Sequence, residues 1–298
     1  MSESRRSRQR TVVGILVIIA IVFILMIILV YPREPDENGN GNERQGPWRD
    51  LDSFKRSISE VNRFNYYEVK GADELEDIIT PTESVYLLIG LETSVNSSEL
   101  VDIGNYLDSG GHVIVADDGV EAQRITNYLF GRAGGKVNFT GHRYLVDRLF
   151  SDPEGDRGFV YNVSFIRGDT FNLMGKRYKL LLHSPNGMEF TGPGKPLSWT
   201  TKQLTVVDLN DNWQMDLEGD RYLQFGDMMV EYDIGTNGGK ITYVTTTGLF
   251  TDNVFELEEN EAFIRAYLYS LLPTGGDVVM DTSNQWGKYS PHTEVLPD

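Results

Sequence analysis

Hydrophobic positions from residue 48 onward follow two alternating patterns. Uninterrupted apolar runs at 84–90 and 112–116 are typical of strands buried on both faces of a parallel sheet. Apolar residues recur at helical spacing in the segments 98–107 and 119–130, which predicts amphipathic helices. This alternation predicts an α/β fold, and a flavodoxin-like doubly wound, mostly parallel sheet is the leading topology.

The rest of the domain predicts further elements, with late strands or a hairpin added to that sheet. Asn237-Gly238-Gly239 lies between two strand-like runs and predicts the hairpin. Additional strands are predicted at 66–69, 179–183, 204–209, 228–232, 240–245 and 276–280, and additional helices at 51–64, 72–79 and 260–272.

One long apolar run near the N-terminus predicts a transmembrane helix. Residues 12–30 are apolar except for Gly14, and about 20 apolar residues span a hydrocarbon core. Arginines precede the run and acidic residues follow it, so the positive-inside rule places the N-terminus in the cytoplasm and the main domain outside. We therefore expect a single-pass protein of the cell membrane, held in the lipid bilayer by this helix. A cleaved signal peptide is the alternative.

Composition shifts divide the chain into five predicted parts. The segment that follows the apolar run is rich in Pro, Gly, Asn and charge, which is typical of a flexible spacer. The parts are a basic tail at 1–11, the transmembrane helix at 12–31, the spacer at 32–47, an α/β domain at 48–282 and a polar tail at 283–298.

Composition and charge exclude several classes of function. The 298 residues include no Cys, which excludes disulfides, thiolate metal centres and a catalytic thiol. The net charge is −17 and argues against nucleic acid as a partner, because such binding needs a basic surface. The charge is uneven: residues 1–31 hold four Arg and one Glu, a net of +3, and the remainder therefore carries −20.

Three segments, within residues 48–282, resemble the domain-of-unknown-function 4350 family. The first, SVYLLIGLETSVNSSELVDIGNYLDSGGHVIVADD, has an apolar strand, a helix that opens near Glu99, a Gly-Gly turn and a strand that ends in acidic residues. The second, GGKITYVTTTGLFTDNVFELEENEAFIRAYLYSLLP, resembles the family's late strand, its Asn after a short turn (Asn253) and its last helix. The third, GGDVVMDTS, resembles the closing strand, although relatives often end it in Asp-Glu and here Asp281-Thr282 stands.

The resemblance implies a fold related to the class I glutamine amidotransferases. It also implies similarity to the outer domains of gliding-motility-type ABC transporter auxiliary proteins. Relatives are usually membrane-anchored, archaeal members are common, and no activity is established for the family. In the amidotransferase fold a nucleophilic Cys follows a central strand. The matching place here is Asp117-Asp118-Gly119, and no Cys stands there.

Four residues are the candidates for a ligand site. Ligands of open parallel sheets bind beyond the carboxyl ends of the strands. Asp117, Asp118 and Gly119 follow the strand predicted at 112–116, and Asp281 follows the one at 276–280. The alternative for Asp118 is a cap of the next helix, since Glu121 follows three residues later in a capping-box-like pattern.

A weak calcium candidate lies in an acidic loop. Asp208, Asp211 and Asp216 belong to the densest cluster of oxygen ligands, which calcium prefers. The sixth position of the loop is Trp213 rather than Gly, so it is not an EF-hand, and a solvated acidic loop is the other interpretation. The four His are far apart, and we expect no metal and no cofactor.

Together these features favour a noncatalytic binding or assembly module in a membrane complex for transport or surface assembly. The expected partner is a membrane protein, and any small ligand is unknown. The alternative is a hydrolase or transferase that uses the carboxylates of Asp117, Asp118 and Asp281.

Overall fold

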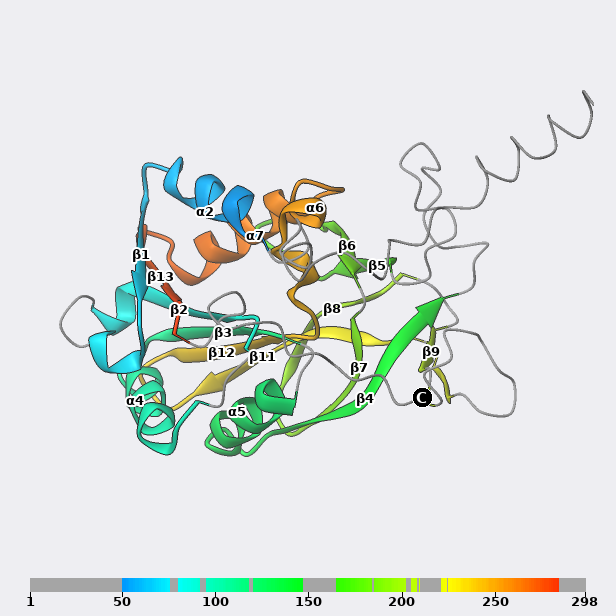
Figure 1. Cartoon of the computed structure of the whole chain (residues 1–298), viewed down its shortest axis with the longest axis horizontal. Coiled ribbons are helices and arrows are strands. Elements are labelled where there is room, and N and C mark those ends of the chain that lie inside the picture. The colour runs from blue at the N-terminus through cyan, green and yellow to red at the C-terminus, as the bar shows by residue number, and fades with distance from the viewer. Residues whose placement is uncertain are drawn as a thin grey trace, which may run out of the picture. The chain divides into compact units, whose positions relative to one another are not determined.

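The apolar runs of the sequence form the centre of a nine-stranded sheet in a computed structural model of the chain (Figure 1). The structure describes residues 50–75, 80–91, 95–117, 120–146, 165–183, 185–201, 205–207, 209, 221–223 and 225–283. All of them belong to one unit, Gln45–Asp298. From edge to edge the sheet consists of β1 (Phe64–Val69), β13 (Gly276–Asp281), β2 (Ser84–Ile89), β3 (His112–Ala116), β12 (Gly239–Val244), β11 (Asp227–Ile234), β8 (Lys195–Thr200), β5 (Phe165–Thr170) and β6 (Lys179–His183).

Helices cover both faces of the parallel half of this sheet. In Figure 1, α2 (Asp52–Ser59) and α7 (Asn260–Leu271) lie on one side, and α4 (Ser97–Asp108) and α5 (Val120–Gly131) lie on the other. The shorter helices are η2 (Ala72–Glu74), η3 (Pro81–Glu83), η5 (Thr247–Leu249) and α6 (Asp252–Phe255). A second, four-stranded sheet has the order β10 (Arg221–Leu223), β9 (Thr205–Val207), β4 (Lys136–Val146) and β7 (Asn186–Thr191).

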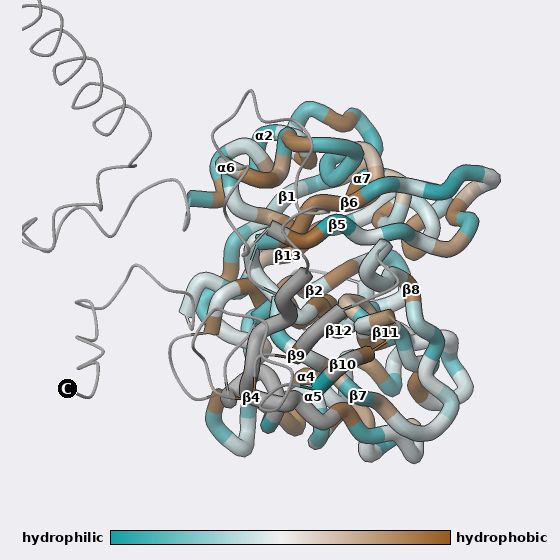
Figure 2. The backbone as a smooth tube through the Cα atoms, turned by 90° about the vertical axis from the view of Figure 1, so that its right-hand side faces the viewer, coloured by the Kyte–Doolittle hydropathy of each residue, from teal (hydrophilic) through white to brown (hydrophobic). Residues whose placement is uncertain are grey.

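The nine-stranded sheet separates two hydrophobic cores. One contains Phe54 of α2 and Phe263 of α7, and the other contains Ile103 of α4 and Leu129 of α5. The side chains of β2 alternate between the cores and are all buried. Figure 2 shows hydrophobic colour along strands such as β6 and β11. Burial of apolar surface on both faces is the main stabilising contribution to such a sheet.

The predicted flavodoxin-like, mostly parallel sheet is wrong, because the sheet is mixed. Only β1, β13, β2, β3 and β12 run parallel to their neighbours, and each step from β12 to β6 is antiparallel. A parallel pair needs a crossover of about a dozen residues, usually a helix. The described residues between α5 and β12 include no helix. The turn at 235–238, which joins β11 to β12, is too short for a parallel crossover, and these two strands pair antiparallel.

The predicted membrane localisation is also corrected. No helix in the described part of the chain is long and apolar enough to cross a membrane. The basic tail, the predicted span at 12–31, the spacer and residues 284–298 lie outside the described residues. The structure therefore does not support the predicted single-pass protein of the cell membrane.

Candidate functional site

Asp281 lies at the carboxyl end of β13, as predicted, but its carboxylate serves the fold. Its side chain is buried, and Oδ2 accepts a hydrogen bond of 2.6 Å from the hydroxyl of Tyr86. Oδ1 accepts from the backbone N–H of Ser283 at 2.6 Å and from the Ser283 hydroxyl at 2.7 Å. Burial, reinforced by the charge of Asp281, raises the pKa of the Tyr86 phenol, which keeps it a donor.

Asp117 joins the carboxyl ends of three parallel strands. Its side chain is buried and accepts a hydrogen bond from the backbone N–H of Leu91, just beyond β2. Its own N–H donates to the carbonyl of Val244 at 3.3 Å, and its carbonyl accepts from the Tyr243 hydroxyl, both on β12. The contacts of Asp117 are therefore with the strand ends that it connects.

Only part of the predicted ligand site, and none of the predicted calcium site, lies within the described residues. Asp117 and Asp281 both lie at the carboxyl ends of parallel strands, but β2 lies between the strands β3 and β13 that carry them. Asp118 and Gly119 lie outside the described residues, as do the calcium candidates Asp208, Asp211 and Asp216. Within the described ranges no group of three His, Asp or Glu side chains could hold a metal ion.

A cavity of about 200 Å³ lies between η2, η3 and α4. We call it the α4 cavity. Its described lining is Ala72, Asp73, Leu75, Pro81, Asp102, Asn105, Tyr106 and Ser109. The four residues from α4 and its end have the spacing i, i+3, i+4, i+7, which places them on one face of the helix. The cavity thus combines a polar helix face with an apolar wall.

Local sequence explains how this cavity forms. Gly71 has a φ of 151°, which L side chains rarely adopt, and it turns the chain from β1 into η2. Pro81 occupies the start of η3, where its missing N–H costs nothing. The Tyr106 hydroxyl lies 2.9 Å from the Ser84 hydroxyl, which ties α4 to the start of β2. Both hydroxyls are buried.

Sequence reasoning missed this cavity, although one signal for it was present. Asp102, Asn105 and Ser109 interrupt the α4 sequence with polar residues on the same side as Tyr106. A polar stripe beside a large aromatic residue is also typical of a solvated helix face. Only the position of η2 against this stripe distinguishes a cavity from open surface.

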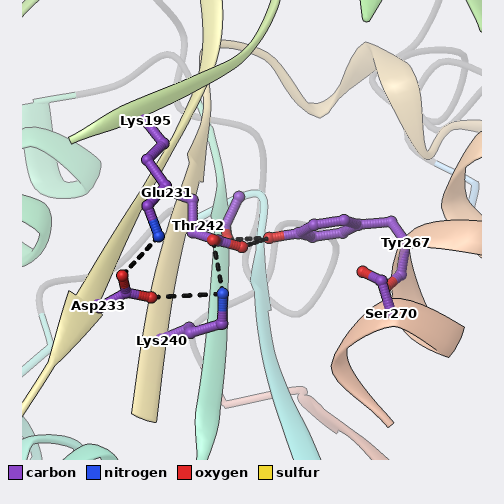
Figure 3. Close-up of polar contacts among 7 residues, drawn as sticks. All are labelled: Lys195, Glu231, Asp233, Lys240, Thr242, Tyr267 and Ser270. Atoms are coloured by element: carbon purple, nitrogen blue, oxygen red, sulfur yellow. Dashed lines mark hydrogen bonds and ion pairs between the residues drawn. The ribbon is translucent and has the colours of Figure 1, made fainter. Parts of the chain in front are cut away.

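A network of charged side chains lies on the opposite face of the sheet, toward α7 (Figure 3). Lys240 Nζ lies 2.7 Å from Glu231 Oε1, and the Tyr267 hydroxyl donates to Glu231 Oε2 at 2.8 Å. Lys240 also lies 3.3 Å from Asp233, which pairs with Lys195 at 2.6 Å. Burial lowers the pKa of Lys240, but Glu231 and Asp233 raise it above its ordinary value. These contacts are internally paired, which indicates a structural role.

His112 lies beside this network in a position that disfavours its charged form. It is 7% exposed, and its Nδ1 has no hydrogen-bond partner among the described residues. Burial and the positive charge of Lys240 lower its pKa, against smaller opposing effects of Glu231 and the Leu271 backbone. His112 is therefore neutral in the folded protein at neutral pH.

Acidification is expected to destabilise the protein through His112. The unfolded state protonates His near its ordinary pKa of about 6.5, whereas the folded state protonates it only at lower pH. Stability is thus unaffected by this group above that pKa and is lost as pH falls below it, by at most about 1.4 kcal/mol per pH unit. Urea unfolding of the wild type and His112→Gln from about pH 7.5 to about pH 5 measures the difference. Parallel stability profiles would contradict the assignment.

Comparisons with known proteins identify no family. No family model and no curated protein matches the chain. The solved structure named "mmIFT52 N-terminal domain" has a TM-score of 0.44 at 15% identity, over 67% of this chain and 79% of that chain. The exo-beta-1,4-mannosidase Op5Man5 from Opitutaceae bacterium strain TAV5 has a TM-score of 0.33 at 11% identity, over 64% of this chain and 25% of that chain. Structural similarity this low supports no statement about the function of the chain. The resemblance to the domain-of-unknown-function 4350 family stays a prediction.

Proposed function

We propose that this domain is a noncatalytic module that binds a small ligand in the α4 cavity. The observation that carries the proposal is the lining itself, which offers carboxylate, amide and hydroxyl groups opposite an apolar wall. Small-molecule sites in proteins are typically concave, with a few polar groups that fix the ligand's orientation. The domain would act by recognising such a ligand and presenting the complex to a partner.

The carboxylates of Asp117 and Asp281 accept hydrogen bonds from other parts of the fold, which supports a binding function over a catalytic one. Asp281 is committed to Tyr86 and Ser283, and Asp117 accepts from the Leu91 N–H. A general acid or base must reach the proton that it transfers, and these carboxylates are buried in contacts with the fold. No observation favours the alternative of a carboxylate-dependent hydrolase or transferase.

The volume of the cavity limits the size of the ligand. An apolar protein cavity of about 150 Å³ holds benzene. At about 200 Å³, the α4 cavity suits a compact ligand of about ten non-hydrogen atoms or fewer. Larger ligands would have only one group inside the cavity.

A variant that fills the cavity is expected to abolish binding without unfolding the domain. Asn105 is exposed on α4 and lines the cavity, so Asn105→Trp places an indole in the cavity at little cost to the core. Backbone amide shifts of the full chain, measured with a library of small organic molecules, should change at 72–75 and 102–109 in the wild type. They should not change in Asn105→Trp.

Val101→Trp is the matched control for this test. Val101 lies on the same helix, is 45% exposed and is absent from the described lining, so binding should persist in this variant. If no molecule perturbs residues 72–75 and 102–109 of the wild type, the proposed function is wrong. Unchanged binding in Asn105→Trp would place the ligand elsewhere.

A further inference from the structure

We infer that the α4 cavity selects small organic cations, specifically a primary ammonium group on a short apolar chain. This inference rests on the proposed function and names its ligand class. Asp73 and Asp102 are the two acidic residues of the described lining, which contains no basic residue. Ala72, Leu75 and Pro81 supply the apolar wall. The lining therefore matches a ligand with one cationic and one apolar end.

Further carboxylates act on the tyrosines of this region. Asp73 of the lining acts on the buried Tyr86, which does not line the cavity, and Asp277 acts on Tyr106, which does. In each case burial is the larger cause of the raised pKa, and the acidic neighbours add to it. A concave site with charges of one sign concentrates ligands of the opposite sign.

One basic side chain close to α4 has its partners outside the described lining. Arg132, at the end of α5, pairs with Asp108 of α4. Its guanidinium also covers Gly104, where an added Cβ would lie 2.5 Å from Nη1. Neither Asp108 nor Gly104 belongs to the described lining. Arg132 thus neutralises a different part of α4 and leaves Asp102 to face the cavity.

Other ligand classes fit the described lining less well. An anion would meet two carboxylates and no cation there, and like charges repel. A neutral ligand would displace water from the carboxylates without supplying a charge in return, which is costly. For a metal ion, the described residues offer no group of three His, Asp or Glu side chains that could hold it. An ammonium group donates three hydrogen bonds and forms charge-assisted bonds to carboxylates.

Three probes of one shape test the inference: 1-butylammonium, 1-butanol and butyrate. Each is titrated into the full chain, and the amide shifts of residues 102–109 report binding. We expect 1-butylammonium to bind about tenfold more tightly than 1-butanol, because hydrogen bonds to charged groups are the stronger ones. Butyrate should bind most weakly, and added salt should weaken only the ammonium probe.

Asp102→Asn separates charge from shape. Asp102 is half-buried on α4, and Asn retains its size, so we expect about a tenfold loss for 1-butylammonium with 1-butanol unchanged. Asp108→Asn removes the same charge from the same helix outside the described lining and should leave all three affinities unchanged. Equal binding of 1-butylammonium and 1-butanol at residues 102–109 would overturn the inference while the proposed function stands. Absence of shifts there with 1-butylammonium would overturn the inference alone, because the wider library tests the proposed function.

Discussion

Asn260→Ala is expected to destabilise the domain by about 3–5 kcal/mol, since each unsatisfied buried polar group costs about 1–3 kcal/mol. Asn260 is fully buried at the start of α7. Its Oδ1 accepts from the Leu181 N–H at 2.9 Å, and its Nδ2 donates to the carbonyls of Leu181 at 2.8 Å and Val254 at 2.9 Å. Alanine leaves all three backbone groups without this partner. Urea unfolding of the full chain measures the loss.

The consequence of this variant extends to the sheet edge. Leu181 lies on β6, the last strand of the nine-stranded sheet, and Glu259 also bonds the backbone of Lys179 in that strand. Uncovered edge strands promote association between chains, so Asn260→Ala should also aggregate more readily. Asn105→Ala, at an exposed helical position, is the control and should lose no stability, because alanine favours helices. A loss below about 1 kcal/mol in Asn260→Ala would contradict the role given to this side chain.

Lys240→Met is expected to destabilise the domain by about 3 kcal/mol, because it leaves a buried charge without its counter-ion. The Glu231 side chain is 8% exposed and the Lys240 side chain 29%. Methionine keeps the length of the aliphatic chain, so the loss reports the charge rather than packing. Thermal or urea unfolding of the full chain measures it.

Two further variants separate this effect from a general loss of charge. Lys195→Met removes a cation from a pair whose side chains are 57% and 54% exposed, and exposed pairs contribute at most about 1 kcal/mol. Adding Glu231→Gln to Lys240→Met removes the uncompensated charge and should restore much of the stability. Equal losses of stability in Lys240→Met and Lys195→Met would show that burial of the Glu231–Lys240 pair does not determine its contribution to stability.

The strands of the parallel half, β6 and the β11–β12 hairpin could be predicted from the sequence, but β5 and β8 of the antiparallel half could not. β2 and β3 are continuous apolar runs, which is the pattern of strands buried on both faces. β5 (FIRGDT) and β8 (KPLSWT) contain Gly, Pro and charged residues, which disfavour strands locally. Their pairing comes from tertiary contacts. Gly168, for example, packs against the side chain of Met228 on β11, which leaves no room for a Cβ at this position.

The candidate site shows a similar limit. The sequence correctly places Asp117 and Asp281 at the carboxyl ends of strands, but it cannot show that Leu91 and Tyr86 engage their carboxylates. The α4 cavity depends on the turn at Gly71 and on the contact of Tyr106 with Ser84. Such contacts join residues that are far apart in the sequence, so local sequence patterns do not predict them.

The structure of the full chain bound to 1-butylammonium is the most direct test of the α4 cavity as the ligand site. We expect to find the ligand between η2, η3 and α4, with its nitrogen at hydrogen-bond distance from Asp102 or Asp73 and its carbon chain against Leu75 and Pro81. A ligand bound at the strand ends beside Asp117 and Asp281, with the α4 cavity unchanged, would contradict this expectation.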